Sequence, residues 1–195
     1  MILISSHLDR VIQDYSLAYK GGLHVGLLDN FIGVLVAYLS LYDDHNLAEL
    51  EKAGEVAFYH GRSEEWSRLD AAAPRLGKSD LAIVVDVAAG EDFDCYDFTI
   101  DNVSGLSKRD AKGLLEDLRW QGFKTRLGLY SGNPDDEDES WQWRKRGVPT
   151  FSFTVPIFAK DDGWHRIQMD NSVSYEEVKK AAQGLKRTIN HFIES

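Results

Sequence analysis

The sequence predicts an α/β protein: a three-layer sandwich with a mixed, mostly parallel β-sheet flanked by helices. Short apolar runs that are typical of buried strands alternate along the chain with segments of helical periodicity. The run 81–87 is continuous, which is expected of a strand covered on both faces, and residues 1–6 form a short apolar run that ends in Ser-Ser. Acidic residues and histidines recur just after such runs, where the ligand-binding edge of a parallel sheet lies.

Length and composition limit the classes of protein that the chain can represent. Its 195 residues, of which 43% are hydrophobic, suit one core, so we expect a single domain over 1–195. The net charge of -10 argues against a nucleic-acid partner, because phosphate binding requires a basic surface. No apolar run approaches the roughly 20 residues of a membrane span, and residues 1–6 lack the pattern of a secretory signal. A cytoplasmic protein without a membrane partner is expected.

The first part of the chain is predicted to run from a buried strand through a glycine-containing loop into alternating helices and strands. The expected strands cover 1–6 and 55–60, the loop covers 10–28, and the expected helices cover roughly 30–43, 46–52 and 64–73. Asp29 or Asn30 is expected to cap the first helix and Ser63 the third. Short polar side chains at these positions accept hydrogen bonds from the N–H groups of a first helical turn.

The remainder of the chain continues the same alternation. The expected strands cover 81–87, 93–100, 123–130 and 150–155, and the expected helices cover 107–120, 134–146 and about 174–194. Gly122 marks the end of the first of these helices. The segment 134–146 begins with acidic residues and ends with basic ones, which compensates a helix dipole. Ser174 and Glu177 form a capping box before the last helix.

An ordered series of potential metal ligands follows the predicted strands. The series comprises His7, Asp9, Asp29, Glu64, Glu65, Asp86 and His165. Two histidines and several carboxylates suffice to hold two zinc-class ions and leave one carboxylate to carry protons. Asp29 alone suits a helix cap, and Glu64 with Glu65 alone suits an acidic first turn. Asp86 is harder to explain structurally, because an unpaired carboxylate is costly to bury after an apolar strand.

Six short segments together resemble co-catalytic metallopeptidases of the M28 and M42 type, the zinc aminopeptidase-like proteins. They are Ser-His-Leu-Asp at 6–9, Leu-Asp-Asn-Phe-Ile-Gly-Val at 28–34, Ser-Glu-Glu at 63–65, Ile-Val-Val-Asp-Val at 83–87, Gly-Val-Pro-Thr at 147–150 and Trp-His-Arg at 164–166. The resemblance extends over essentially the whole chain. It implies the zinc-peptidase or phosphorylase/hydrolase-like version of the α/β sandwich.

The resemblance implies a metal-binding role for five residues. Asp29 would bridge two ions. His7 and Asp86 would complete one site, and Glu65 and His165 would complete the other. The implied cofactors are two divalent ions, zinc by preference, although cobalt and manganese also suit histidine and carboxylate ligands.

Two further residues receive catalytic roles from the same resemblance. Glu64 would be the general base that accepts a proton from the attacking water and passes it to the leaving amine. Asp9 would orient or support His7. In related enzymes an acidic residue before the Gly-Val-Pro segment lies near the metals, which points to Asp138 or Glu139.

The chain departs from these relatives in its extent. The first proposed ligand is already residue 7, and there is no room for the inserted domain of M42-type members. We therefore expect a minimal catalytic domain without an inserted lid or dimerisation domain. A more open active site, a partner subunit that supplies the missing surface, and metal binding without peptidase activity are all compatible with this departure.

The leading hypothesis is a di-zinc aminopeptidase that acts on N-terminal peptide bonds or small amides. A related amidase, deacylase or carboxypeptidase remains an alternative, since Arg62 and Arg166 flank proposed ligands and suit a substrate carboxylate. A non-catalytic metal-binding or interaction module is a third hypothesis, and an α/β domain without metal is a fourth. The expected partners are a peptide or small amide substrate and a second copy of the chain.

Overall fold

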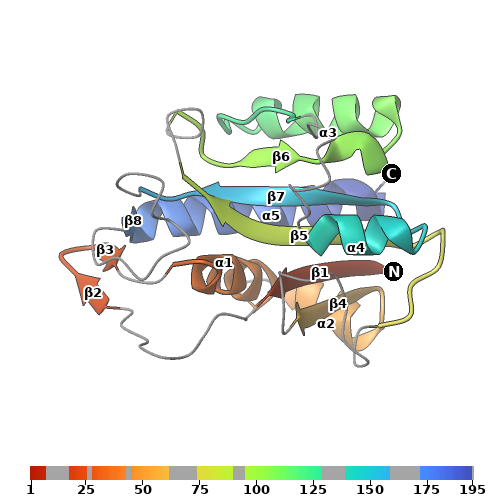
Figure 1. Ribbon diagram of the computed structural model, residues 1–195, viewed down its shortest axis with the longest axis horizontal. Coiled ribbons are helices and arrows are strands. Elements are labelled where there is room, and N and C mark those ends of the chain that lie inside the picture. The colour runs from red at the N-terminus through yellow and green to blue at the C-terminus, as the bar shows by residue number, and fades with distance from the viewer. Residues whose placement is uncertain are drawn as a thin grey trace.

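The computed structural model describes residues 1–7, 18–25, 28–42, 45–61, 74–89, 95–128, 139–158 and 172–194. A five-stranded sheet of order β4-β1-β5-β7-β6 forms its centre (Figure 1). The strands are β1 (Ile2–His7), β4 (Val56–Gly61), β5 (Leu81–Ala88), β6 (Thr99–Asp101) and β7 (Thr150–Pro156). Only the edge strand β6 pairs antiparallel to its neighbour. The predicted mixed, mostly parallel sheet is confirmed.

Helices cover both faces of this sheet. They are α1 (Phe31–Tyr42), α2 (His45–Lys52), α3 (Lys108–Trp120), α4 (Glu139–Lys145) and α5 (Tyr175–Glu194), with a 3₁₀ turn at Val103–Gly105. Helices α1 and α5 pack against each other and against the sheet, whereas α4 lies on the opposite face (Figure 1). The three-layer sandwich is therefore also confirmed.

The alternation of side chains along the strands divides the core into two apolar layers. Ile83 and Val85 of β5 face the layer beneath α1 and α5, whereas Ala82 and Val84 face the layer beneath α4. Successive residues of a strand point to opposite faces, which is why a continuous apolar run is required here. Trp143 of α4 is fully buried in the second layer, so its role is packing.

A small second sheet replaces part of the loop that the sequence predicts over 10–28. It consists of β2 (Ala18–Lys20), β3 (Leu23–Val25) and β8 (Ser172–Ser174), all antiparallel. Gly21 and Gly22 connect β2 to β3 with φ angles of 56° and 85°. A two-residue hairpin loop with positive φ at both positions favours glycine, so Gly-Gly was the signal for this turn. The prediction of an irregular loop was wrong over these strands.

Two of the predicted strands are shorter or absent. Among the described residues 95–100 of the first segment only Thr99 and Ile100 belong to a strand, and residues 123–128 of the second form no strand. The second segment nevertheless runs beside the first: Asp97 N–H donates to the Lys124 carbonyl at 2.8 Å, and Ile100 N–H donates to the Arg126 carbonyl at 2.9 Å. Leu127 makes one isolated bridge with Ile100. A few irregularly spaced backbone hydrogen bonds thus take the place of regular β-strand pairing at this edge of the sheet.

The predicted helix boundaries agree with the structure where it describes them. Ser174 N–H donates to Glu177 Oε2 at 2.7 Å and Glu177 N–H donates to Ser174 Oγ at 3.1 Å, which is the expected capping box of α5. The predicted helix at 64–73 and residues 134–138 lie outside the described residues. No described helix has the length and apolar character needed to cross a membrane.

Candidate metal centre

His7 and Asp86 meet at the edge of the sheet where the parallel strands end. The pairing of β1 with β5 places Ser5 opposite Val84, and the same register continued by two residues places His7 opposite Asp86. His7 Nε2 lies 3.2 Å from Asp86 Oδ1. Both residues are buried, with 1% and 9% of their surfaces exposed. The structure thus brings together these two residues at one edge, as the sequence predicts.

Asp29 reaches the same point from the segment that leads into α1. Its Oδ1 lies 3.5 Å from His7 Nε2, and the residue is only 5% exposed. One ligand atom from each of His7, Asp29 and Asp86 can be chosen so that all three lie within 4.8 Å of one another. Three of the five predicted metal ligands are therefore neighbours in space.

The other predicted site residues cannot be located in the same way. Asp9, Glu64, Glu65 and His165 lie outside the described residues, as do Arg62, Arg166 and Asp138. Their roles remain predictions from the sequence.

The described ligand set suits a divalent cation. An imidazole nitrogen and two carboxylates are donors that zinc-class ions accept. Two carboxylates buried close together repel one another, and each loses the hydration that it has in water. A cation held between Asp29 and Asp86 would offset both costs. The chemistry of His7, Asp29 and Asp86 therefore fits the metal ions that the sequence predicts.

Glu139 adds a third carboxyl group close to this cluster. It is the first residue of α4, it is 1% exposed, and Ser5 Oγ donates a hydrogen bond to its Oε1. Burial raises the pKa of Glu139 to about 7, partly opposed by the hydrogen bond from Ser5 and the charge of His7, while Asp86 raises it further. The resemblance suggests Asp138 or Glu139 as an acidic residue near the metals, and the structure describes Glu139. Its carboxyl group interacts electrostatically with the proposed ligands His7 and Asp86.

Glu139 is expected to make the stability of metal-free protein fall as pH rises from about 4.5 to about 7. The folded state keeps the Glu139 proton in this interval while the unfolded state releases it, so raising the pH favours unfolding. A pKa raised from 4.5 to about 7 corresponds to up to about 3 kcal/mol. The measurement is urea unfolding of chelator-treated wild type and Glu139→Gln at pH 5 and pH 8.

Between pH 5 and pH 8, the free energy of unfolding of the wild type should fall by most of that amount relative to that of Glu139→Gln. Glu49→Gln, which changes an exposed carboxylate of α2, is the control and should follow the wild type. Parallel profiles for wild type and Glu139→Gln would show that Glu139 is ionised in the folded protein throughout.

Several residues around the cluster were not identified as site residues from the sequence. Ser5 and Ser6 are fully buried polar residues in a strand that otherwise starts with apolar side chains. Asn30, predicted only as a possible helix cap, bonds to Ser6 and to the backbone of β5. The available signals were the Ser-Ser pair at the end of an apolar run and the amide directly after Asp29.

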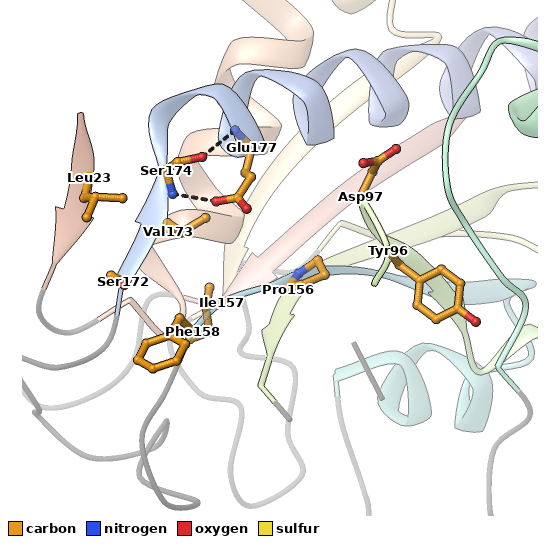
Figure 2. A pocket seen from close by; sticks show the side chains of 10 residues that line it. All are labelled: Leu23, Tyr96, Asp97, Pro156, Ile157, Phe158, Ser172, Val173, Ser174 and Glu177. Carbon is orange, nitrogen blue, oxygen red and sulfur yellow. Dashed lines mark hydrogen bonds between the residues drawn. The ribbon is translucent and has the colours of Figure 1, made fainter. Parts of the chain in front are cut away.

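A hollow of about 220 Å³ opens beyond the end of β7 (Figure 2). Its lining is partly apolar and includes two carboxylates: Leu23, Tyr96, Asp97, Pro156, Ile157, Phe158, Ser172, Val173, Ser174 and Glu177. Thr154 is the pairing partner of Asp86, and Pro156 follows two residues later. Strand geometry therefore places Pro156 roughly 8 Å from Asp86 along the same edge of the sheet.

Comparisons with known proteins identify the fold but no family. No protein-family model matches the sequence, and no curated protein matches it significantly. Among solved structures, PhTET1-12s, a dodecamer, matches with a TM-score of 0.53 and 14% identity over 89% of this chain and 53% of that one. The prApe1 structure matches with a TM-score of 0.54 and 10% identity over 92% and 47%.

A third similar structure is that of yeast aminopeptidase 1. Its TM-score is 0.50 at 9% identity, over 92% of this chain and 49% of that one. This chain therefore has a zinc-peptidase-like fold and spans about half the length of these structures. At such low identity the likeness concerns the fold, and function has to be argued from the site.

Proposed function

We propose that this chain is a co-catalytic metallohydrolase of the aminopeptidase type, acting on N-terminal peptide bonds or small amides. One observation carries the proposal: His7, Asp29 and Asp86 converge, buried, at the carboxyl edge of a parallel sheet. Ligands of open α/β sheets bind at this edge. The similarity of the fold to that of yeast aminopeptidase 1 adds support by analogy.

The proposed ligands divide between two ions. Asp29 would contact both, His7 and Asp86 would complete one site, and Glu65 and His165 would complete the other. The ions, when bound, would polarise a substrate carbonyl and lower the pKa of a bound water toward about 7. The protein contributes a buried, preorganised arrangement of donors, in which the contacts of His7 with both aspartates already exist.

Glu64 and Asp9 would complete the catalytic machinery. Gly61 is paired with His7, and Glu64 follows three residues later in the chain. The Glu64 carboxylate would accept a proton from the attacking water and pass it to the leaving amine, while Asp9 would hold the His7 ring in its binding orientation.

The hollow beside β7 supports a substrate with an apolar side chain. Its lining includes Ile157 and Phe158, and apolar walls would accept an apolar side chain (Figure 2). The two carboxylates of the lining are already engaged within the protein: Asp97 pairs with Lys180 at 2.9 Å, and Glu177 accepts from the Ser174 N–H in the capping box of α5.

Self-association of the chain is part of the proposal. The PhTET1-12s structure, whose fold this chain shares in part, is a dodecamer. By analogy with that assembly, this chain would bind a second copy of itself.

Metal content is the first test of this function. Tag-free protein that has been supplemented with zinc and dialysed should hold about two ions per chain by elemental analysis, as expected for a co-catalytic site. His7→Ala and Asp86→Ala should each lower that number, because each removes a donor from the described cluster. His191→Ala is the matched control, since His191 lies beside Asp117 between α3 and α5.

The alternatives differ in the number of bound ions or in the presence of amide hydrolysis. One ion per chain would contradict the two-ion centre and leave a mononuclear site. Folded protein without metal would contradict the function altogether. Two ions without hydrolysis of N-terminal, C-terminal or acyl amides would favour the non-catalytic metal-binding module.

A further inference from the structure

The side chain of Asn30 connects three separate segments of the chain. It is 3% exposed and lies where the start of α1 meets the ends of β1 and β5. Its Nδ2 donates to Ser6 Oγ at 3.0 Å and to the Val85 carbonyl at 2.7 Å. Its Oδ1 accepts from the Gly33 N–H at 3.0 Å. One amide group thus joins two strands and a helix.

Asn30 and its two partners in the sheet are each next to a proposed metal ligand in sequence. Ser6 precedes the proposed histidine ligand, Val85 precedes the aspartate of β5, and Asn30 follows the third ligand. Neighbouring side chains of a strand point to opposite faces, so the side chain of Ser6 points away from that of the histidine. The amide therefore fixes the ligand-bearing backbone without competing for the ligand atoms.

The hydrogen bonds of Asn30 exceed what a helix cap requires. The bond from the Gly33 N–H to Oδ1 is an ordinary N-cap interaction of α1. The two bonds from Nδ2 reach across to the sheet and add nothing to capping. Serine caps a helix about as well as asparagine does, but its side chain is too short to make these cross-links.

Gly33 leaves the space that this arrangement needs. A Cβ atom at position 33 would lie 2.7 Å from Asn30 Cγ and 2.8 Å from Asn30 Nδ2. Real Cβ atoms do not approach other atoms so closely, so an alanine here would displace the amide from Ser6 and Val85.

We infer that Asn30 is a positioning residue whose amide sets the relative positions of His7, Asp29 and Asp86 for metal binding. The inference rests on the proposed function, because it concerns the same three residues. Groups that hold metal ligands in place typically change metal affinity by about 10–100-fold when they are removed. Sub-ångström placement of ligands is what such groups provide.

The test compares Asn30→Ser with the wild type, since serine keeps the cap and removes the cross-links. Zinc affinity, measured by competition with a chromogenic chelator, should fall by at least about tenfold. The visible absorption of the cobalt-loaded protein should change in intensity. In chelator-treated protein, the NMR signals of the His7 ring and of the Asp86 amide should shift.

Ser40→Ala is the matched control. Ser40 is also buried in α1, and its Oγ donates to the Ala37 carbonyl at 2.8 Å within the helix. This variant removes a buried hydrogen bond of the same helix without touching β1 or β5. It should leave zinc affinity, the cobalt spectrum and the His7 signals unchanged.

Gly33→Ala provides a second, independent variant. It should weaken zinc binding by displacing the amide, although alanine favours the helix more than glycine does. In the Asn30→Ser background the asparagine amide is absent and cannot be displaced, so Gly33→Ala should cause no further loss of zinc affinity. Should Asn30→Ser fail to fold, Gly33→Ala alone carries the comparison with Ser40→Ala.

The inference is overturned if the variants bind zinc and cobalt like the wild type and leave the metal-free His7 signals in place. Asn30 would then be a helix cap only. If the wild type binds no metal, the proposed function fails, and the His7 and Asp86 signals of the metal-free variants still decide whether Asn30 positions these residues. If the wild type binds metal but hydrolyses no amide, the zinc affinities of the variants decide whether Asn30 positions these residues.

Discussion

Glu64→Gln is expected to lower kcat by about 10²–10⁴-fold while the protein keeps its full complement of metal. Glutamine has nearly the same size as glutamate and cannot accept a proton at neutral pH. In the proposed mechanism Glu64 moves the proton and Glu65 binds an ion, so metal content and proton transfer should separate at this position. The measurement combines steady-state kinetics on an aminoacyl amide with elemental analysis of the same preparation.

Glu49→Gln, on the exposed side of α2, is the control for changing one carboxylate of this acidic chain and should leave both quantities unchanged. Loss of metal in Glu64→Gln would identify Glu64 as a ligand instead of a base. Full activity with full metal content would exclude it from catalysis.

Gly184→Ala is expected to destabilise the fold by about 1–3 kcal/mol, even though alanine is the better helix former. Gly184 lies in the buried face of α5, and a Cβ atom there would approach Phe98 Cζ to 2.6 Å. Phe98 cannot easily move aside, since it stacks on Phe153 with ring centroids 4.5 Å apart and also contacts Phe123 at 5.3 Å. Helix α5 would have to move away from the sheet.

Gly113→Ala in α3 separates helix propensity from steric overlap. Within the described part of the chain its Cβ atom would meet only His191, at 3.7 Å, which is an ordinary contact. The variant should therefore gain up to about 1 kcal/mol from helix propensity. Urea unfolding of the two variants beside the wild type measures both effects, and equal shifts of the same sign would contradict the packing argument.

The elements that the sequence predicted well carry their signals locally. The apolar run of β5 and the Ser174–Glu177 capping box of α5 each lie within a few neighbouring residues. The strands β2, β3 and β8 are three residues long, too short for a periodic pattern. The pairing of β3 with β8 also joins residues about 150 positions apart in sequence, since Leu23 pairs with Ser174.

The candidate site likewise contains residues that a local sequence pattern predicts and residues that no local pattern predicts. His7 and Asp86 were predictable because each stands at the end of an apolar strand run, and parallel strands end at a common edge. The burial of Glu139 was not, because it is the last residue of an acidic run and such a run is usually solvated. The bonds of Asn30 to Ser6 and Val85 require the register of β1 against β5, which no local pattern encodes.

The candidate ligands come from parts of the chain that meet only through the sheet. His7 and Asp86 are 79 positions apart, so no short stretch of unfolded polypeptide can present this set of donors. An ion that binds the folded chain alone pulls the unfolding equilibrium toward the native state by mass action. At a free concentration one hundred times the dissociation constant, the gain is about 2.7 kcal/mol. The supply of metal in its surroundings would thus help to determine how much of this chain is folded.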